Sequence, residues 1–410
     1  MTANPAIPVV ALERQTAEAD ARITAMNYSF TSRPANALWF SARYRQYQFD
    51  NRTPVFETNG YVNYDTSYSA TTNHETEPLG YIRHTFDADA SYSPVRYLGF
   101  RAGYTREEVD RTHRMVEKTT EDTARASLDV TGLGWLTLRG IYEHGKRTGS
   151  EVNGLELLAI GEQPLLRQFD ISDRNRDRFS GIVQVTPFSF LSFNGSASIG
   201  QEEYPGSYFG LRNNDNHVYS AGFDLVPSEA VSLGMTYGWE KYNALQASRT
   251  ANPLPANTVD YLNDPTQQFN DPRRDWTDDS ADKVKTFNTS FDLLKVIPKT
   301  EVRLGYDYSR AQSTYVYSLA ANTTIAAPVQ LPAVINKLQR GTLDVQYFLT
   351  RHLAIGGVYW YDSYAVNDFA LGEQPSLALP ATASPAIMQM GYAYKPYTAN
   401  TFWGRMTYLW

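Results

Sequence analysis

The stretch Tyr97-Leu-Gly-Phe-Arg-Ala-Gly-Tyr104 contains the pattern that decides the fold of this 410-residue chain. Its even positions are apolar or aromatic: Leu98, Phe100, Ala102 and Tyr104. From Gly99 onwards its odd positions are small or charged: Gly99, Arg101 and Gly103. Side chains of a β-strand alternate between its two faces, so the stretch predicts a strand with one apolar and one polar face. The same alternation recurs in residues 135–142, 231–239 and 301–308.

Aromatic residues lie towards the ends of these apolar faces, which is typical of a transmembrane β-barrel with lipid outside and a polar lumen. The chain has no apolar run long enough for a spanning helix, and its mean hydropathy is −0.45. Only helices and closed barrels satisfy every backbone group in lipid. We therefore predict an all-β, antiparallel, up-and-down barrel in the bacterial outer membrane. The alternative is a large soluble β-protein such as a propeller, but the expected blade period of about 40–50 residues is missing.

The strands are predicted in pairs, each joined by a tight turn with the chemistry of a hairpin. The pairs are 21–32 with 37–49, 81–92 with 97–109, 119–131 with 135–146, 174–186 with 189–202, 215–226 with 230–243, 282–296 with 300–316, and 337–349 with 353–367. Longer polar loops separate the pairs, at 50–80, 148–172, 203–213, 244–280, 317–335 and 368–399. Outer-membrane barrels have short periplasmic turns and long extracellular loops, which assigns the two kinds of connection to the two sides.

The chain ends on one more alternating strand with a final aromatic residue, Trp410, as outer-membrane proteins commonly do. Residues 386–394 form a further candidate strand, so the prediction is about 15 or 16 strands. Strand parity places residues 1–20 on the extracellular side, as a loop, with the barrel domain at 21–410. We therefore expect this chain to be the C-terminal part of a larger barrel. The alternative is a complete sixteen-stranded porin with unusual termini.

Two sets of side chains follow from the alternation. Those expected to face lipid are Leu98, Phe100, Leu136, Leu138, Leu233, Met235, Leu304 and Tyr306. Those expected to face the lumen are Arg101, Arg139, Arg303, Arg405, Asp87, Asp129, Asp224, Asp292, Asp307 and Asp344. An Arg or Lys facing hydrocarbon at mid-bilayer would cost about 2–4 kcal/mol, so this second set requires a polar lumen. The charges could hold a polar partner or line a water-filled pore, or they could pair with one another across strands.

Other chemistry is not indicated by the sequence. The formal charge of −7 argues against nucleic acid as a partner. The absence of Cys excludes a thiolate metal site and a Cys-x-x-Cys-His haem attachment, so we expect no cofactor on this chain. The six His residues are scattered, and no nucleophile–base arrangement is apparent, so we expect no enzyme activity.

Several stretches together resemble one family. They are residues 30–34 (Phe-Thr-Ser-Arg-Pro), 44–54 with Asp-Asn-Arg-Thr-Pro at its end, 359–370 beginning Tyr-Trp-Tyr-Asp, and 397–400 (Tyr-Thr-Ala-Asn). They are similar to the decahaem-associated outer-membrane barrels of the MtrB/PioB type. The resemblance implies a barrel of about 26 strands in the intact protein. It also implies a multihaem c-type cytochrome in the lumen, and in some members a second cytochrome outside the cell. Some members carry an N-terminal Cys-x-x-Cys, which this chain lacks.

Three functions are therefore compared. The first is a conduit that embeds a multihaem cytochrome and insulates it for extracellular electron transfer. The second is a diffusion porin or substrate-specific channel, for which we would expect a constriction loop folded inward. The third is a barrel enzyme or adhesin, for which the sequence offers no catalytic arrangement.

Overall fold

The computed structural model describes Arg14 and residues 16–63, 67–152, 154, 163–250, 271–368 and 396–408. Most of these residues form one 16-stranded sheet. Within the described residues, no helix is long and apolar enough to cross a membrane. The predicted all-β, antiparallel, up-and-down architecture is confirmed.

The sheet is built from long hairpins whose strands follow one another in chain order. Its first half contains β1 (Ala21–Ala35), β2 (Leu38–Asn51), β5 (Tyr81–Val95), β6 (Leu98–Arg111), β7 (Lys118–Val130), β8 (Leu136–Gly149), β10 (Arg174–Phe188) and β11 (Leu191–Glu203). Its second half contains β12 (Phe209–Ser228), β13 (Val231–Arg249), β14 (Asp275–Ile297), β15 (Thr300–Leu319), β16 (Val334–Phe348), β17 (Leu353–Asn367) and β18 (Tyr397–Tyr408). A single 3-10 turn, η1 (Pro272–Arg274), precedes β14 within the described residues.

The prediction from the sequence was wrong at three places, all at the end of the strands where the long connections lie. The predicted loop 50–80 contains a separate hairpin of β3 (Glu57–Asn63) and β4 (Ser67–Glu75). The two-residue strand β9 (Leu166–Arg167) pairs in parallel with the start of β12. Strands β12 to β15 also extend several residues beyond the predicted ends. Backbone pairing between neighbouring strands continues there, although the alternation of apolar and polar residues has ended. The candidate strand 386–394 lies outside the described residues, as do residues 1–13 of the predicted N-terminal segment.

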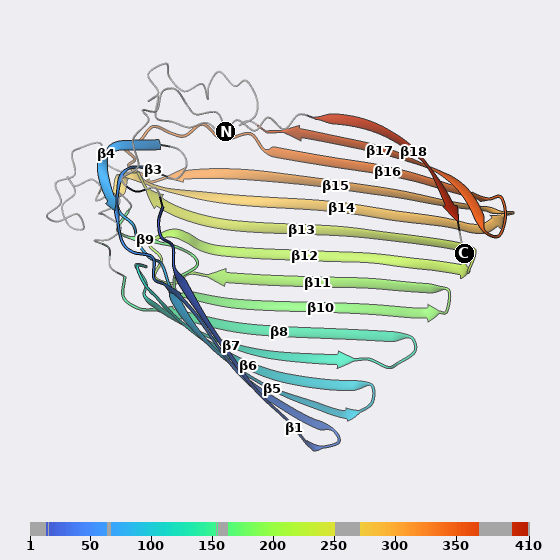
Figure 1. Ribbon diagram of the computed structural model, residues 1–410, viewed down its shortest axis with the longest axis horizontal. Helices are drawn as coiled ribbons and strands as arrows, with labels where there is room; N and C mark the ends of the chain where they lie inside the picture. Colours follow the sequence, from blue (N-terminus) through green and yellow to red (C-terminus); the bar gives the residue numbers. More distant parts are fainter. Residues whose placement is uncertain are drawn as a thin grey trace.

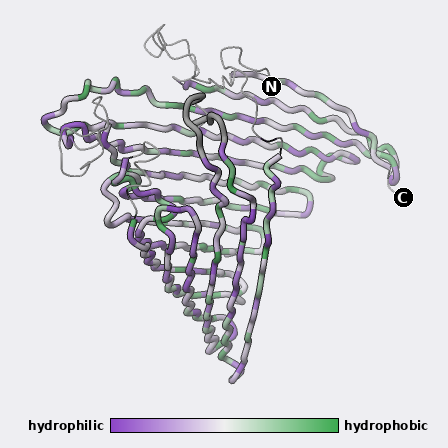
Figure 2. Tube along the Cα trace, turned by 60° about the vertical axis from the view of Figure 1, so that its left-hand side comes forward, coloured by the Kyte–Doolittle hydropathy of each residue, from purple (hydrophilic) through white to green (hydrophobic). Residues whose placement is uncertain are grey.

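Figures 1 and 2 show a curved sheet with β1 at one edge and β18 at the other. Tight turns join the hairpins at one end of the strands, whereas β3, β4 and β9 lie at the opposite end (Figure 1). No pairing joins β1 to β18, so the sheet is open among the residues that the structure describes. The sheet therefore has a turn end, where the tight turns lie, and a loop end, where β3, β4 and β9 lie.

The strand registers align apolar side chains into rows across the sheet. Directly opposite residues of an antiparallel pair lie on the same face. One row crosses eight strands without interruption: Leu191, Leu225, Leu233, Phe291, Leu304, Leu343, Tyr359 and Phe402. Phe100 and Leu128 form a similar pair between β6 and β7. Because side chains alternate in period two, a shift of one residue anywhere would break such a row.

The most deeply buried side chains gather at the loop end. Ile171 and Val116 are each 2% exposed and come from the connections after β8 and β6. Phe209 and Tyr204, at the connection between β11 and β12, are 2% and 4% exposed. Elsewhere large apolar side chains are exposed, as Phe100 is at 45% and Phe402 at 75%. A single sheet whose apolar face lies against lipid has no need of a conventional core along its strands.

Candidate functional site

The ten charged residues predicted to face a lumen all lie on one face of the sheet. The registers link them: Asp129 is opposite Arg139, Asp292 is opposite Arg303, and Arg303 is also opposite Asp344. The remaining members follow by strand alternation: Arg101, Arg405, Asp87, Asp224 and Asp307. We call this face the polar face. The opposite side, which carries Phe100, Leu138 and Leu304, is the apolar face.

Ion pairs and hydrogen bonds within the polar face satisfy most of these charges. Arg139 pairs with Asp129 on the neighbouring strand. Arg45 donates to Asp87 at 2.9 Å, and Thr105 donates to the other oxygen of the same carboxylate at 3.0 Å. Further contacts to members of the set are Ser232 to Asp292 at 3.2 Å, Asn194 to Asp224 at 3.3 Å, Arg101 to Ser91 at 3.2 Å and Arg303 to Glu301 at 3.1 Å. Charge pairing across strands, one of the interpretations that the sequence left open, is therefore present at Arg139 with Asp129 and at Asp87 with Arg45, whereas Arg303 pairs within its own strand.

One of these ion pairs spans three strands. Arg405 on β18 donates to Asp344 at 2.9 Å and to Gln346 at 3.0 Å, both on β16. The side chain crosses β17 over Gly356, which is opposite both Arg405 and Gln346 in the registers. A Cβ on Gly356 would lie 3.1 Å from Arg405 Nε, so the missing side chain is what makes this crossing possible.

The middle rows of the polar face from β10 to β13 contain several small, neutral side chains, although Ile182 and Glu240 also lie in these rows. Ser180 and Ser198 hydroxyls are 3.3 Å apart, and those of Ser196 and Ser220 are 2.8 Å apart. The positions beside them include Gly222, Gly234 and Gly238. Short neutral side chains leave the backbone wall accessible to close approach by another surface. Close approach is therefore possible at these Ser and Gly positions.

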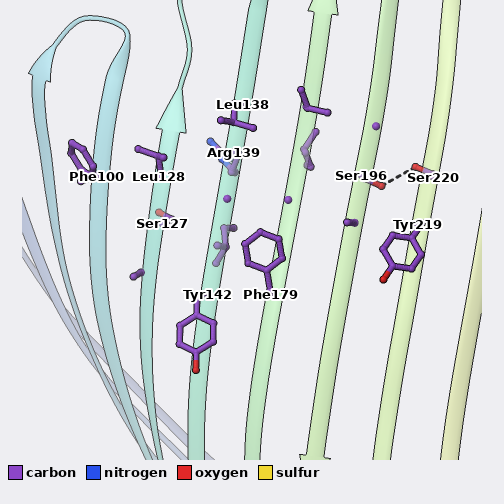
Figure 3. A pocket seen from close by; sticks show the side chains of 18 residues that line it. Phe100, Ser127, Leu128, Leu138, Arg139, Tyr142, Phe179, Ser196, Tyr219 and Ser220 are labelled. Carbon is purple, nitrogen blue, oxygen red and sulfur yellow. Dashed lines mark hydrogen bonds between the residues drawn. The ribbon is translucent and has the colours of Figure 1, made fainter.

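The apolar face has a shallow hollow over the strands from β6 to β12. Figure 3 shows Phe100, Leu128, Leu138, Tyr142, Phe179 and Tyr219 around it. The hollow has a volume of about 810 Å³ and exists because Gly140, Gly181 and Gly195 contribute no side chain to its floor. All the residues predicted to face lipid lie on this apolar face. Both faces thus agree with the alternation read from the sequence.

A segment between β8 and β10, residues 163–173, folds over the polar face at the loop end. Arg147, only 9% exposed, donates from Nε to the Ser172 carbonyl at 2.7 Å and from its terminal nitrogen to the Phe169 carbonyl. Asp170 forms an ion pair with Arg114 at 2.7 Å. At its other end, β9 approaches Gly210, where φ is +100° and a Cβ would lie 2.2 Å from the Arg167 carbonyl oxygen. We call residues 163–173 the rim segment.

Beside the rim segment lies a charge network that the sequence analysis did not find. Arg174 is bound to Glu121 at 2.8 Å and to Glu202 at 3.4 Å. Tyr204, which follows β11, donates to Glu202 at 3.0 Å, and burial raises the pKa of its hydroxyl to about 12. These partners come from β7, β10 and β11, so only the strand registers could have brought them together.

Neither metal-binding nor catalytic chemistry is visible among the described residues. No group of three or more acidic or His side chains there could hold a metal ion. The acidic residues between Asp271 and Asp279, which the sequence places in a loop, belong largely to β14, where Asp275, Asp278 and Asp279 take part in strand pairing. The arrangement is that of a wall, with one face suited to lipid and the other to water or a polar surface.

Comparison with known proteins agrees with this architecture. A family model described as "Putative outer membrane beta-barrel porin, MtrB/PioB" matches residues 1–410. The chain belongs to the MtrB/PioB family. It is therefore an outer-membrane β-barrel protein, and the family is not a class of enzymes.

One curated relative and one solved structure can be compared with this MtrB/PioB chain. Outer membrane protein MtrB of Shewanella baltica (strain OS185) is 22% identical over 365 residues, which are 86% of this chain and 47% of that protein. The chain thus spans about half the length of this relative. A bacterial polysaccharide outer membrane secretin is 11% identical, with coverage of 86% of this chain and 95% of that one, but the TM-score is only 0.27.

Proposed function

We propose that this chain forms part of the wall of an outer-membrane barrel that holds a multihaem c-type cytochrome and so carries electrons across the membrane. Membership of the MtrB/PioB family is the observation that carries this proposal. In it the polar face lines the lumen, the apolar face meets lipid, and the haems belong to the partner. A second, extracellular cytochrome would then receive or supply electrons at the loop end.

The geometry of the polar face supports a protein as occupant. Its Ser and Gly positions between β10 and β13 allow a folded partner to approach the backbone closely, whereas a long side chain at these positions would hold it away. Several of its flanking charges are already paired across strands, as with Arg139 and Asp129. Desolvation of an unpaired charge is costly, and a partner that binds this face does not have to desolvate these paired charges as isolated ions.

A low-dielectric wall around the haems would exclude water and fix their spacing, which is what a passive conduit has to contribute. The protein itself would perform no redox chemistry. This division of roles agrees with a chain that has no Cys for covalent haem attachment.

The alternative is a diffusion porin, and the rim segment favours it. In a porin, a loop folded over the polar face narrows the pore, and residues 163–173 lie in this position, held by Arg147. Facing charges such as Arg174 and Glu121 would then set the selectivity.

Purification of the intact protein from native outer membranes separates the two functions. For a conduit, we expect haem absorbance to co-elute with the barrel at a fixed ratio, and little ion conductance in planar bilayers. A haem-free barrel that conducts small ions would reject the conduit and leave the porin.

A further inference from the structure

A cavity of about 500 Å³ opens on the polar face at the loop end. Its lining combines four guanidinium groups, from Arg83, Arg111, Arg114 and Arg147, with apolar side chains that include Phe49 and Tyr81. The registers place these elements together, since Tyr81 is opposite both Phe49 and Arg111. Arg114 is contributed by the connection after β6, and Arg147 by β8. We call this cavity the arginine pocket.

The arginine pocket has an excess of positive charge. Only two carboxylates, Glu107 and Asp170, are in its lining. Arg83 is 3.8 Å from Glu107, and Arg114 is paired with Asp170 at 2.7 Å. Two guanidinium groups therefore remain without a carboxylate of their own in the lining.

Arg111 is the clearest of these. Its guanidinium donates to Thr119 Oγ1 at 2.9 Å and to the Val109 carbonyl at 3.5 Å, both of which are neutral. Arg111 forms no ion pair within the part of the chain that the structure describes. In addition, Arg114 Nε is buried without a hydrogen-bond partner. Clustered guanidinium groups with donors to spare are the arrangement that recognises carboxylates in bidentate fashion.

We propose that the arginine pocket receives a carboxylate-bearing, partly apolar group of the protein held against the polar face. This inference rests on the proposed function. A lipid headgroup would reach the barrel from the apolar side, whereas the pocket opens on the other side. The mixed lining suits an anionic group next to an apolar one, which an acidic side chain beside aliphatic residues and a haem edge with its propionates both present.

The test compares complexes purified from native outer membranes. In the double variant R83Q/R111Q the pocket loses two positive charges, but the contacts of Arg147 and Arg114 to the rim segment remain. We expect the cytochrome to dissociate about tenfold more readily, with a weaker dependence on salt than in the wild type. The matched control is R310Q, since Arg310 lies on the apolar face and donates only to Gln312 at 3.3 Å. It should leave cytochrome retention unchanged.

Haem spectroscopy on the same samples identifies the source of the carboxylate. A shift in the reduction potential of one haem in R83Q/R111Q indicates a propionate, whereas weaker binding with unchanged potentials indicates an acidic side chain. Retention equal to that of wild type and R310Q overturns the arginine pocket and leaves the conduit standing. A wild-type barrel that carries no cytochrome rejects the proposed function itself, and the pocket's role with it.

Discussion

Gly356 shows how the absence of one side chain lets an ion pair cross three strands. Replacement by Ala would place a Cβ 3.0 Å from the Val345 carbonyl oxygen and 3.1 Å from Arg405 Nε. We expect Gly356→Ala to displace Arg405 from Asp344 and to destabilise the barrel by about 1–3 kcal/mol, the usual range for overpacking. The measurement is the urea midpoint of the folded barrel in detergent. Gly357→Ala is the control, because nothing lies within 4 Å of its Cβ position; equal losses in the two variants would contradict the account.

The stability of the turn before β14 is expected to depend on pH through Asp271, which lies outside the membrane-spanning strands. The Arg273 side chain, which donates to its carboxylate at 2.9 Å, lowers the pKa of Asp271 below its ordinary value. A carboxylate with a lowered folded pKa stabilises the fold above its unfolded pKa of about 4, and this is lost as the pH falls through the folded value. We expect amide exchange of Arg273, whose N–H donates to Asp271 at 3.0 Å, to accelerate at acid pH beyond the intrinsic rate. In Asp271→Asn this extra acceleration should vanish, since an Asn still caps the turn but does not titrate.

At the scale of elements, the rim segment depends on Arg147. Its two hydrogen bonds hold the carbonyls of Phe169 and Ser172 against the polar face. We expect Arg147→Ala to release residues 163–173 and to raise trypsin cleavage at Arg167 about tenfold, as the loss of a buried charged hydrogen bond would allow. Arg178→Ala is the control, because Arg178 is exposed and lies on the same face one hairpin strand away. If both variants resist trypsin as wild type does, other contacts hold the segment.

The elements also show what the sequence could and could not predict. Period-two alternation located each long hairpin and assigned Phe100 and Arg101 to opposite faces, because burial in lipid imposes that pattern on every residue of the wall. The β3–β4 hairpin was missed, because a strand outside the bilayer does not have to alternate. Arg405 and Asp344 were both selected by the sequence, but their pairing was not, because it depends on the combined register of three strands.

At the scale of the whole molecule, the two faces can be tested with neighbouring residues. The chain has no Cys, so each introduced thiol is unique. Ser196 lies on the polar face and Ala197 on the apolar face. We expect a water-soluble maleimide to label Ser196→Cys in the empty barrel, and to be blocked there when the cytochrome is bound. Ala197→Cys should react only with a lipid-soluble reagent; equal labelling of the two positions by the water-soluble one would refute the assignment of the faces.

The order of strands in the sheet has a consequence for how the protein reaches the membrane. The strands of the main sheet lie side by side in the order in which they occur in the chain. The partner of each new strand has therefore already been synthesised. Within each hairpin the closing turn is short, and the free-energy cost of closing a longer connection grows by only about 0.6 kcal/mol for each doubling of its length. Low contact order of this kind favours rapid folding. Insertion can accordingly advance one hairpin at a time, with every newly added strand covering the exposed backbone edge of the last.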